Sequence, residues 1–454
     1  MADNITSKLR AFLLGRVLGL ERHEYVAVAW SFAYFFCVLS SYYILRPIRE
    51  AMAVGSGANT IPYLFLGTFT AMMFASPIFG WVTSRYPRRT FLPWVYLFFI
   101  YNILIFSFVF SQISEGGSNH VWLGRIFFVW LSVFNLFVVS VFWSFMADIY
   151  TRNQGRRLFG IITAGGSIGA LIGGATTSIL VVRIGFEFLF PIAATMLLLA
   201  IPCIRKLRKW VAHEHETESG NAVVADKPLG GNPFSGITHV FGSNYFLGIV
   251  ASSVIASLLG TALYMFAAQL VEDSIPGANA RIEFFSNINF WTNLFALLGQ
   301  IFIVRHIVVR FGIGRALALL PIVSIIGFAY LWLDPTLAVV AFLTIARRAL
   351  GFSFSKPTTD MLYSVVTPEE KYKTKNFIDT AVYRFGDIVG TWAVTITMGG
   401  SIFGVSLLAF GISLGIAGVS LVMLPFAAVW TVVSLWLGRD YKRRALQLKG
   451  MGIE

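Results

Sequence analysis

The sequence predicts an all-α integral membrane protein with about twelve transmembrane helices in two six-helix bundles. Of its 454 residues, 57% are hydrophobic and only 13% are charged, whereas soluble domains carry about 25% charged residues. This number of charged residues is too small to cover the apolar surface of the chain in water. We therefore expect the protein to lie in a lipid bilayer. Both cysteines lie in apolar runs, so neither a disulfide framework nor a metal site is predicted, and no cofactor is expected.

Apolar runs place the spans, because a helix needs about 20 mostly apolar residues to cross a bilayer. The predicted spans are 25–46, 60–83, 91–112, 120–146, 157–182, 184–204, 245–270, 283–305, 313–333, 335–357, 374–400 and 404–437. A polar stretch divides them into two equal sets. The predicted domains are an N-terminal six-helix bundle (1–204), a cytoplasmic linker (205–244) and a C-terminal six-helix bundle with a cytoplasmic tail (245–454).

Basic residues predict the orientation, because cytoplasmic loops of membrane proteins are enriched in Lys and Arg. Of the 35 Lys and Arg residues, 26 lie in the termini, the linker and the loops on the same side as these. The opposite side holds only Arg46, Arg49, Arg183 and Arg281. We therefore expect a multi-pass protein of the cytoplasmic (inner) membrane. Both of its termini are expected to lie in the cytoplasm. Topology also explains most of the net charge of +13, so the partners expected are membrane lipid and a solute, not nucleic acid.

The two halves share a pattern that indicates an internal repeat. Each has its largest polar loop after its fourth span, at 145–160 and at 358–377. Asp148 and Asp360 lie near the respective span ends, and a basic segment follows each. A repeat of this kind indicates a secondary transporter that works by alternating access. The alternative is that any two cytoplasmic loops are basic.

Glycines recur every three or four residues in the fifth predicted span, at Gly165, Gly169 and Gly173. In a membrane such a face permits close approach of a second helix. It is interpreted as a packing face, with a sliding surface between moving halves as the alternative. A nucleotide-binding glycine loop is excluded because the cluster lies inside an apolar helix.

Charges inside the predicted spans mark candidate site residues, because a charge in the membrane core is costly without a cavity or a partner. Arg46 and Arg49 are three residues apart, so both can lie on one helix face, and Pro47 between them is expected to kink or break the helix. The other candidates in or beside spans are Arg125, Glu272, Arg347, Arg348, Lys356, Asp379, Arg384 and Asp387.

Structural alternatives stand beside each candidate. Arg46 can pair with Glu50 at i+4, and Arg384 can pair with Asp387 at i+3. Arg347 and Arg348 can act as anchors at the membrane interface.

Taken together, the cations favour an anionic solute, because arginine binds phosphate and carboxylate with two parallel hydrogen bonds. The alternative is a proton-coupled transporter or exporter of a non-nucleotide solute, for which Asp148, Asp360, Asp379 and Asp387 are the candidate proton sites. A third reading is a membrane scaffold or sensor that transports nothing. The short linker and the lack of a soluble domain between the halves weigh against it. No enzymatic activity is expected.

The six-plus-six layout and one loop resemble the major facilitator superfamily. The loop GWVTSRYPRRT matches that superfamily's pattern of Gly, three residues, Asp-Arg, one residue and Gly-Arg-Arg at Gly80, Arg85, Arg88 and Arg89. The resemblance implies the major-facilitator fold.

Three stretches resemble the ATP/ADP translocase family more closely. YYILRPIREAMAVGSGANTIPYLF (42–65) is similar to its first-helix segment, and QLVEDS (269–274) to its Asn-Leu-Val-Glu segment. DMLYSVVTPEEKYKTKNFIDTAVYRFGD (360–387) is similar to its Glu-Met-Ala-Tyr to Arg-Phe-Gly segment. This family exchanges nucleotides, so the resemblance implies a nucleotide or another phosphorylated anion as the solute.

The resemblance also implies roles for single residues. Arg46 matches the family's Arg, Arg49 its Lys, and Glu272 its Glu, while Asp379 and Arg384 match the later motif. The chain departs from the family in two places. Thr359-Asp360 replaces the family's Lys-Glu, with Lys356 one turn earlier as the candidate substitute, and no Glu precedes the FWSF run (142–145). The expected substrate-binding residues are Arg46, Arg49, Glu272, Lys356, Arg348 and Asp360, and the expected gating or coupling residues are Asp148, Asp379, Arg384 and Asp387.

Overall fold

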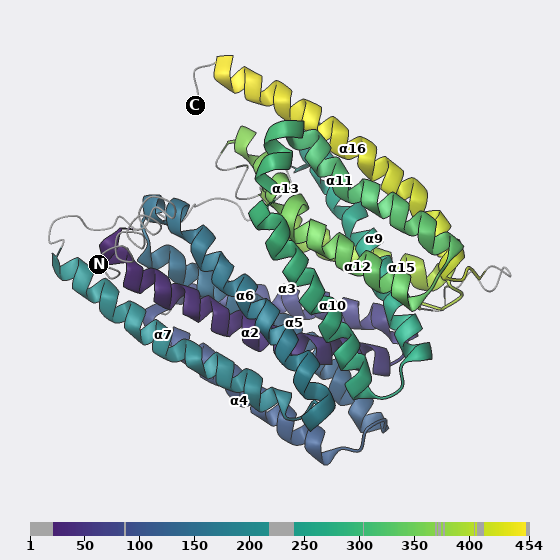
Figure 1. Ribbon diagram of the computed structural model, residues 1–454, viewed down its shortest axis with the longest axis horizontal. Coiled ribbons are helices and arrows are strands. Elements are labelled where there is room, and N and C mark those ends of the chain that lie inside the picture. The colour runs from purple at the N-terminus through teal and green to yellow at the C-terminus, as the bar shows by residue number, and fades with distance from the viewer. Residues whose placement is uncertain are drawn as a thin grey trace, which may run out of the picture. The chain divides into compact units, whose positions relative to one another are not determined.

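The computed structural model describes residues 21–85, 88–217, 240–302, 304–367, 370, 374–375, 377–403, 405 and 413–450. Most of the predicted linker (218–239) and the first 20 residues lie outside this range. The principal helices of the described chain (Figure 1) are α2 (Tyr25–Gly55), α3 (Ile61–Arg85), α4 (Arg88–Gln112), α5 (Ser118–Ile149), α6 (Arg152–Ile184), α7 (Leu189–Thr217), α9 (Asn244–Ser274), α10 (Ala278–Phe302), α11 (Val304–Leu333), α12 (Leu337–Leu350), α13 (Lys356–Leu362), α15 (Tyr383–Thr397) and α16 (Ile416–Gly450).

Each of the predicted spans overlaps a helical segment, which confirms the all-α membrane fold. Within the described residues, nine helical segments are long and apolar enough to cross a membrane. One of them runs from Leu337 to Val365 through α12 and α13. The spans predicted at α3, α10 and α15 overlap helices that are not among the nine. The last predicted span began at 404, whereas α16 begins at Ile416, and residues 406–412 lie outside the description.

The chain divides into two compact units. The first combines the described residues of Met1–Gly55, Thr70–Ala225 and Gly277–Phe290. The second combines those of Ser56–Phe69, Asp226–Pro276 and Trp291–Glu454. The start of α3 therefore belongs to the second unit, and the start of α10 to the first. The division into bundles at 1–204 and 245–454 stays a prediction.

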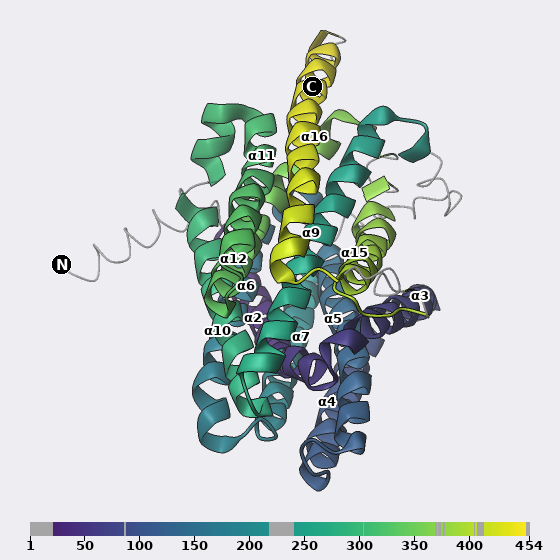
Figure 2. The ribbon, with the colours of Figure 1, turned by 90° about the vertical axis from the view of Figure 1, so that its right-hand side faces the viewer.

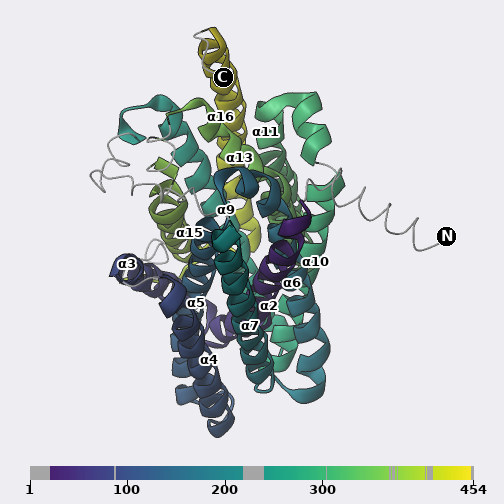
Figure 3. The ribbon, with the colours of Figure 1, turned by 90° about the vertical axis from the view of Figure 1, so that its left-hand side faces the viewer.

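In the first unit α2 is the central helix, and α6 and α7 run beside it (Figures 1 and 3). The α6 glycines face the α2 backbone: a Cβ on Gly173 would lie 2.7 Å from the Ser40 carbonyl oxygen. The Ser40 hydroxyl donates to the Gly169 carbonyl at 3.0 Å. Small residues thus let two helix backbones touch and let a serine side chain donate a hydrogen bond to the neighbouring backbone, as is common between membrane helices. The packing interpretation of this glycine face is what the contacts support.

In the second unit, α11 and α16 run side by side, and α9 contacts α12, α15 and α16 (Figure 2). Gly314 and Gly438 bring the α11 and α16 backbones together, because a Cβ on Gly438 would lie 2.1 Å from the Gly314 Cα. On α15, a Cβ on Gly386 would lie 2.9 Å from the Ser257 Cβ. Close helix contact through glycine therefore recurs in this unit as well.

Prolines lie inside helices in both units. The expected break at Pro47 does not occur, since α2 continues through it to Gly55. Pro47 cannot donate to the carbonyl four residues earlier, but contacts with neighbouring helices keep a membrane helix together where one backbone bond is missing. The same holds for Pro77, Pro93, Pro202, Pro321 and Pro425.

Two π-helical segments interrupt the α-helical pattern of the second unit. Gly351–Ser355 links α12 to α13, and Ile378–Val382 precedes α15. Segments of this kind are rare and occur frequently at functional sites. Both lie beside the charged residues that the sequence singled out, whereas the break inside α11 is a single residue, Gly312, with φ 77°.

Candidate functional site

The C-terminal part of α2 presents two arginines on one face of the first unit. Arg46 and Arg49 are 19% and 14% exposed as side chains, and Glu50 is 9% exposed. Arg46 Nε lies 3.7 Å from Glu50 Oε1, and Arg49 Nη1 lies 3.9 Å from the same oxygen. Charge-assisted hydrogen bonds between these groups are about 2.7–2.9 Å long, so both ion pairs are loose. Two guanidinium groups thus share one carboxylate oxygen in a nearly buried place.

Aromatic rings supply the remaining surroundings of these arginines. The Arg46 guanidinium lies 5.5 Å from the Tyr43 ring and donates to the Tyr43 hydroxyl at 3.4 Å. The Arg49 guanidinium lies 4.0 Å from the centre of the Phe128 ring on α5. A ring face stabilises a cation without neutralising it. The pair therefore keeps a net positive charge, and its arginine forks suit a phosphate or carboxylate group.

In the second unit, Lys356 is held in a network of alternating charges. Its Nζ lies 2.7 Å from Asp379 Oδ2 and 3.6 Å from Asp360 Oδ1, and Lys375 Nζ lies 2.9 Å from Asp360. Lys356 is 51% exposed as a side chain. The structure thus brings Lys356 and Asp360, expected to bind substrate, together with Asp379, expected to act in gating or coupling, and two carboxylates neutralise the two lysines.

Glu272, placed by the sequence after the seventh span, is exposed in the last turn of α9. Its Oε2 accepts a hydrogen bond of 2.7 Å from the Ala58 backbone N–H. Ala58 opens the 3-10 turn Ala58–Thr60 that leads into α3. The carboxylate therefore caps a helix start, where a negative charge is favoured.

Asp387 on α15 is a buried carboxylate, 8% exposed. It accepts hydrogen bonds from the hydroxyls of Ser257 and, at 3.4 Å, Thr261, both on α9. Arg384 Nη1 lies 3.3 Å from its other oxygen, so the i+3 ion pair expected from the sequence is present. The serine and threonine were missed in the sequence. Their spacing of four residues, which places both on one face of a mostly apolar helix, was the available signal.

Three further candidates are Asp148, Arg348 and Arg347. Asp148 is exposed near the end of α5, and Arg348 is half-buried in the last turn of α12. Its neighbour Arg347 was a candidate charge in the sequence, with an anchor at the membrane interface as the alternative, but it was not among the expected substrate-binding residues. It is 7% exposed and donates to the Ala256 carbonyl oxygen at 3.3 Å. Side chains of the loop residues Arg85, Arg88 and Arg89 lie outside the described side chains.

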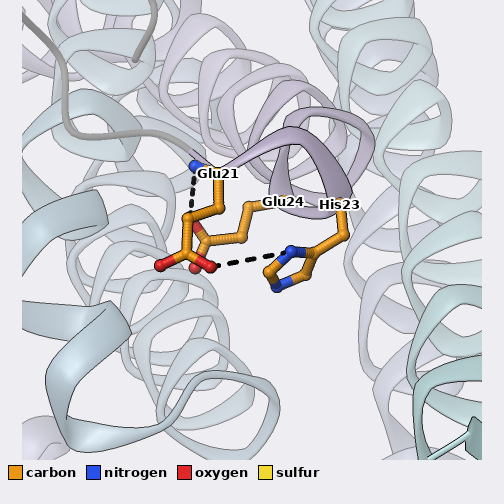
Figure 4. A group of neighbouring side chains, drawn as sticks. All are labelled: Glu21, His23 and Glu24. Carbon is orange, nitrogen blue, oxygen red and sulfur yellow. Dashed lines mark hydrogen bonds and ion pairs between the residues drawn. The ribbon is translucent and has the colours of Figure 1, made fainter. Parts of the chain in front are cut away.

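One group of metal-type ligands lies before α2. Glu21, His23 and Glu24 point toward one another (Figure 4), and their ligand atoms lie within 4.8 Å of each other. Arg157 Nη2 lies 3.1 Å from Glu21 and 2.9 Å from the buried Glu24. Because a guanidinium already faces both carboxylates, their arrangement is explained by an ion-pair network that ties α6 to the start of α2.

The fold and these charged residues are typical of a membrane transporter, and similarity to known proteins identifies the superfamily. Residues 30–391 match the Major Facilitator Superfamily, so the chain belongs to this superfamily. It is also similar to ADP,ATP carrier protein 1 of Chlamydia trachomatis, with 22% identity over 98% of this chain and 93% of the relative. ADP,ATP carrier protein 2 of Chlamydia pneumoniae is 21% identical over 97% of this chain and 92% of the relative. These matches, which cover nearly the whole of both chains, confirm the resemblance to the ATP/ADP translocase family.

A solved structure supports the fold independently. The nucleoside transporter NupG aligns with a TM-score of 0.56 at 16% identity, over 92% of this chain and 98% of that chain. At this identity the likeness concerns the fold alone.

Proposed function

We propose that this protein is a secondary active transporter that moves an anionic, phosphorylated solute of the nucleotide type across the cytoplasmic membrane by alternating access. The observation that carries the proposal is the Arg46–Arg49 pair, in which two nearly buried guanidinium groups face one carboxylate. A phosphorylated solute is strongly anionic at neutral pH, and only nearby cations offset the cost of stripping its water. The similarity to ADP,ATP carriers supports the same class of solute.

Within this proposal Arg46 and Arg49 bind the phosphate groups. In the second unit, Lys356 and Arg348 are further proposed substrate contacts, with Asp360 holding Lys356 between transport steps. Glu272 contributes by fixing the start of the segment that leads into α3. Both termini are assigned to the cytoplasm on the distribution of basic residues.

Ligand-induced thermal stabilisation of the purified full-length protein in detergent tests the proposal. The panel comprises ATP, ADP, AMP, adenosine, pyrophosphate, amino acids and lipids. We expect Tm to rise with ADP and ATP, less with AMP, and least with adenosine, because the contacts are to phosphate. A rise with an amino acid or lipid, and none with any phosphate compound, contradicts the proposal.

A second candidate function, proton-coupled transport, rests on Asp387. Asp387 is 8% exposed and lies between two hydroxyls and one arginine. During transport it can alternate between a protonated state and an ionised state that is paired with Arg384. A proton-coupled protein in liposomes accumulates solute when a pH gradient is imposed, and D387N abolishes that accumulation. Exchange that is indifferent to the gradient removes this candidate.

A further inference from the structure

Arg347 is a buried cation without a counter-ion in the described part of the chain. It is 7% exposed, and no carboxylate of the described residues lies within 4.0 Å of its guanidinium. Its polar contact is one hydrogen bond of 3.3 Å, donated by Nη2 to the Ala256 carbonyl oxygen on α9. Its Nε has no hydrogen-bond partner. The Trp430 ring on α16 is 6.0 Å away, at the outer limit of a cation–π contact.

This arrangement is costly as a purely structural feature. Arginine does not lose its proton in proteins, so the charge is present wherever the side chain lies. One carbonyl dipole and one distant ring do not replace the water that the guanidinium has lost. Lysine networks such as that of Lys356 show that this chain can place carboxylates beside cations when a neutral cluster is formed. At Arg347 it does not.

The nearest elements leave the balancing charge to something else. Ala256, which accepts from Arg347, immediately precedes Ser257, which donates to Asp387. The Asp387 carboxylate, however, is already engaged by two hydroxyls and by Arg384. Gly260, one turn along α9, lies beside the guanidinium, because a Cβ added to it would be 3.9 Å from Arg347 Nη1. As a glycine it offers no side chain that could balance the charge.

The backbone beside Arg347 has an unusual helical geometry. The π-helical segment Gly351–Ser355 begins four residues later, and a Cβ added to Gly351 would meet no atom within 4 Å. A shift between π and α hydrogen-bond register turns the preceding residues relative to those that follow. Such a rotation would move the Arg347 guanidinium away from the Ala256 carbonyl oxygen, and one hydrogen bond to a neutral acceptor would be lost.

We infer that Arg347 is an anion-binding residue of the second unit. When the Arg347 side chain leaves the Ala256 carbonyl, its guanidinium binds a phosphate group of the transported solute. This inference rests on the proposed function and deepens it, because it assigns the second unit a phosphate contact that the motif resemblance does not indicate. A guanidinium suits this role because it forms two parallel hydrogen bonds with a phosphate.

Two measurements on R347Q test the inference, with the exposed Arg315 changed to Gln as the matched control. The first is the Tm of the ligand-free protein, which we expect to hold or rise in R347Q, because an uncompensated buried charge is removed. The second is the affinity for ADP from the concentration dependence of the Tm shift. We expect it to be about 10–100-fold weaker in R347Q, as for loss of a charged hydrogen-bond partner, and unchanged in R315Q. R347K retains the charge and is expected to lie between R347Q and the wild type.

Three outcomes are distinguishable. If the wild type responds to ADP and R347Q responds with equal affinity, the inference is wrong while the proposed function stands. If R347Q lowers the ligand-free Tm and keeps its affinity for ADP, Arg347 serves helix packing, and the inference is again wrong. If the wild type itself responds to no phosphate compound, the proposed function fails, and the inference fails with it.

Discussion

The charged clusters of the two units differ in how completely their charges neutralise one another. On α2, Arg46 and Arg49 share one carboxylate at 3.7 and 3.9 Å, with side chains 19% and 14% exposed. In the second unit, Lys356 and Lys375 face two carboxylates, with contacts as short as 2.7 Å and with more exposed side chains. The lysine network is neutral and exposed, so it needs no ligand. The α2 pair is positive and nearly buried, so an incoming anion stabilises it.

This difference changes the role that Lys356 can have. To bind an anionic solute, Lys356 must first leave Asp379 and Asp360, so the solute competes with two carboxylates. Within the described residues, Glu50 is the carboxylate with which a solute would compete for Arg46 and Arg49. The α2 pair is therefore expected to dominate affinity, and the lysine network to adjust it.

The largest effect expected from this comparison is that of E50Q. Removing the one carboxylate that Arg46 and Arg49 share leaves two cations uncompensated, and breaking a buried ion pair in this way costs about 3–5 kcal/mol. We expect a marked fall in Tm in detergent and a larger rise with pyrophosphate than in the wild type, because the anion takes the place of the carboxylate. An unchanged Tm would show that Glu50 does not stabilise the pair.

A smaller effect is expected at the α2–α6 contact. In G173A the new Cβ would meet the Ser40 carbonyl oxygen at 2.7 Å, and overpacking of this kind costs about 1–3 kcal/mol. The matched control is G160A in the same helix, where a Cβ meets no atom within 4 Å and the change is expected to be neutral or stabilising. Equal Tm values for the two variants would contradict the close packing of α6 on α2.

The smallest effect is expected for D379N. Lys356 then keeps Asp360 at 3.6 Å and half of its surface in solvent, so the loss is expected to be below about 1 kcal/mol. Affinity for ADP is expected to rise slightly, because one competitor of the solute has lost its charge. A fall in Tm as large as that of E50Q would end the distinction between the two clusters.

Local features of this protein were predictable, and long-range ones were not. Apolar runs located the helices because the bilayer imposes their length, and the Arg384–Asp387 pair followed from helical spacing. The sequence did not decide between a kink and a break at Pro47, because the contacts that keep α2 continuous come from other parts of the chain. The same applies to the pairing of Arg157 with Glu24 and to that of Lys375 with Asp360.

Burial explains the remaining gap at the candidate site. Arg347 and Arg348 are adjacent and chemically identical, yet the first is buried against α9 and the second is half-buried. Neighbouring residues on a helix point about 100° apart, and sequence alone does not say which of the two directions meets another helix. For that reason the sequence singled out both residues but selected Arg348.

The most direct test of the central claim is exchange of labelled ADP in liposomes that contain purified protein. R49Q is compared with R183Q, which changes an exposed arginine in the last turn of α6. We predict ADP exchange by the wild type and by R183Q, and a loss of about 100-fold or more in R49Q, since a buried charged contact to phosphate is removed. Exchange of ADP or of another phosphorylated anion by R49Q at the wild-type rate would contradict the assignment of Arg46 and Arg49 as the anion site.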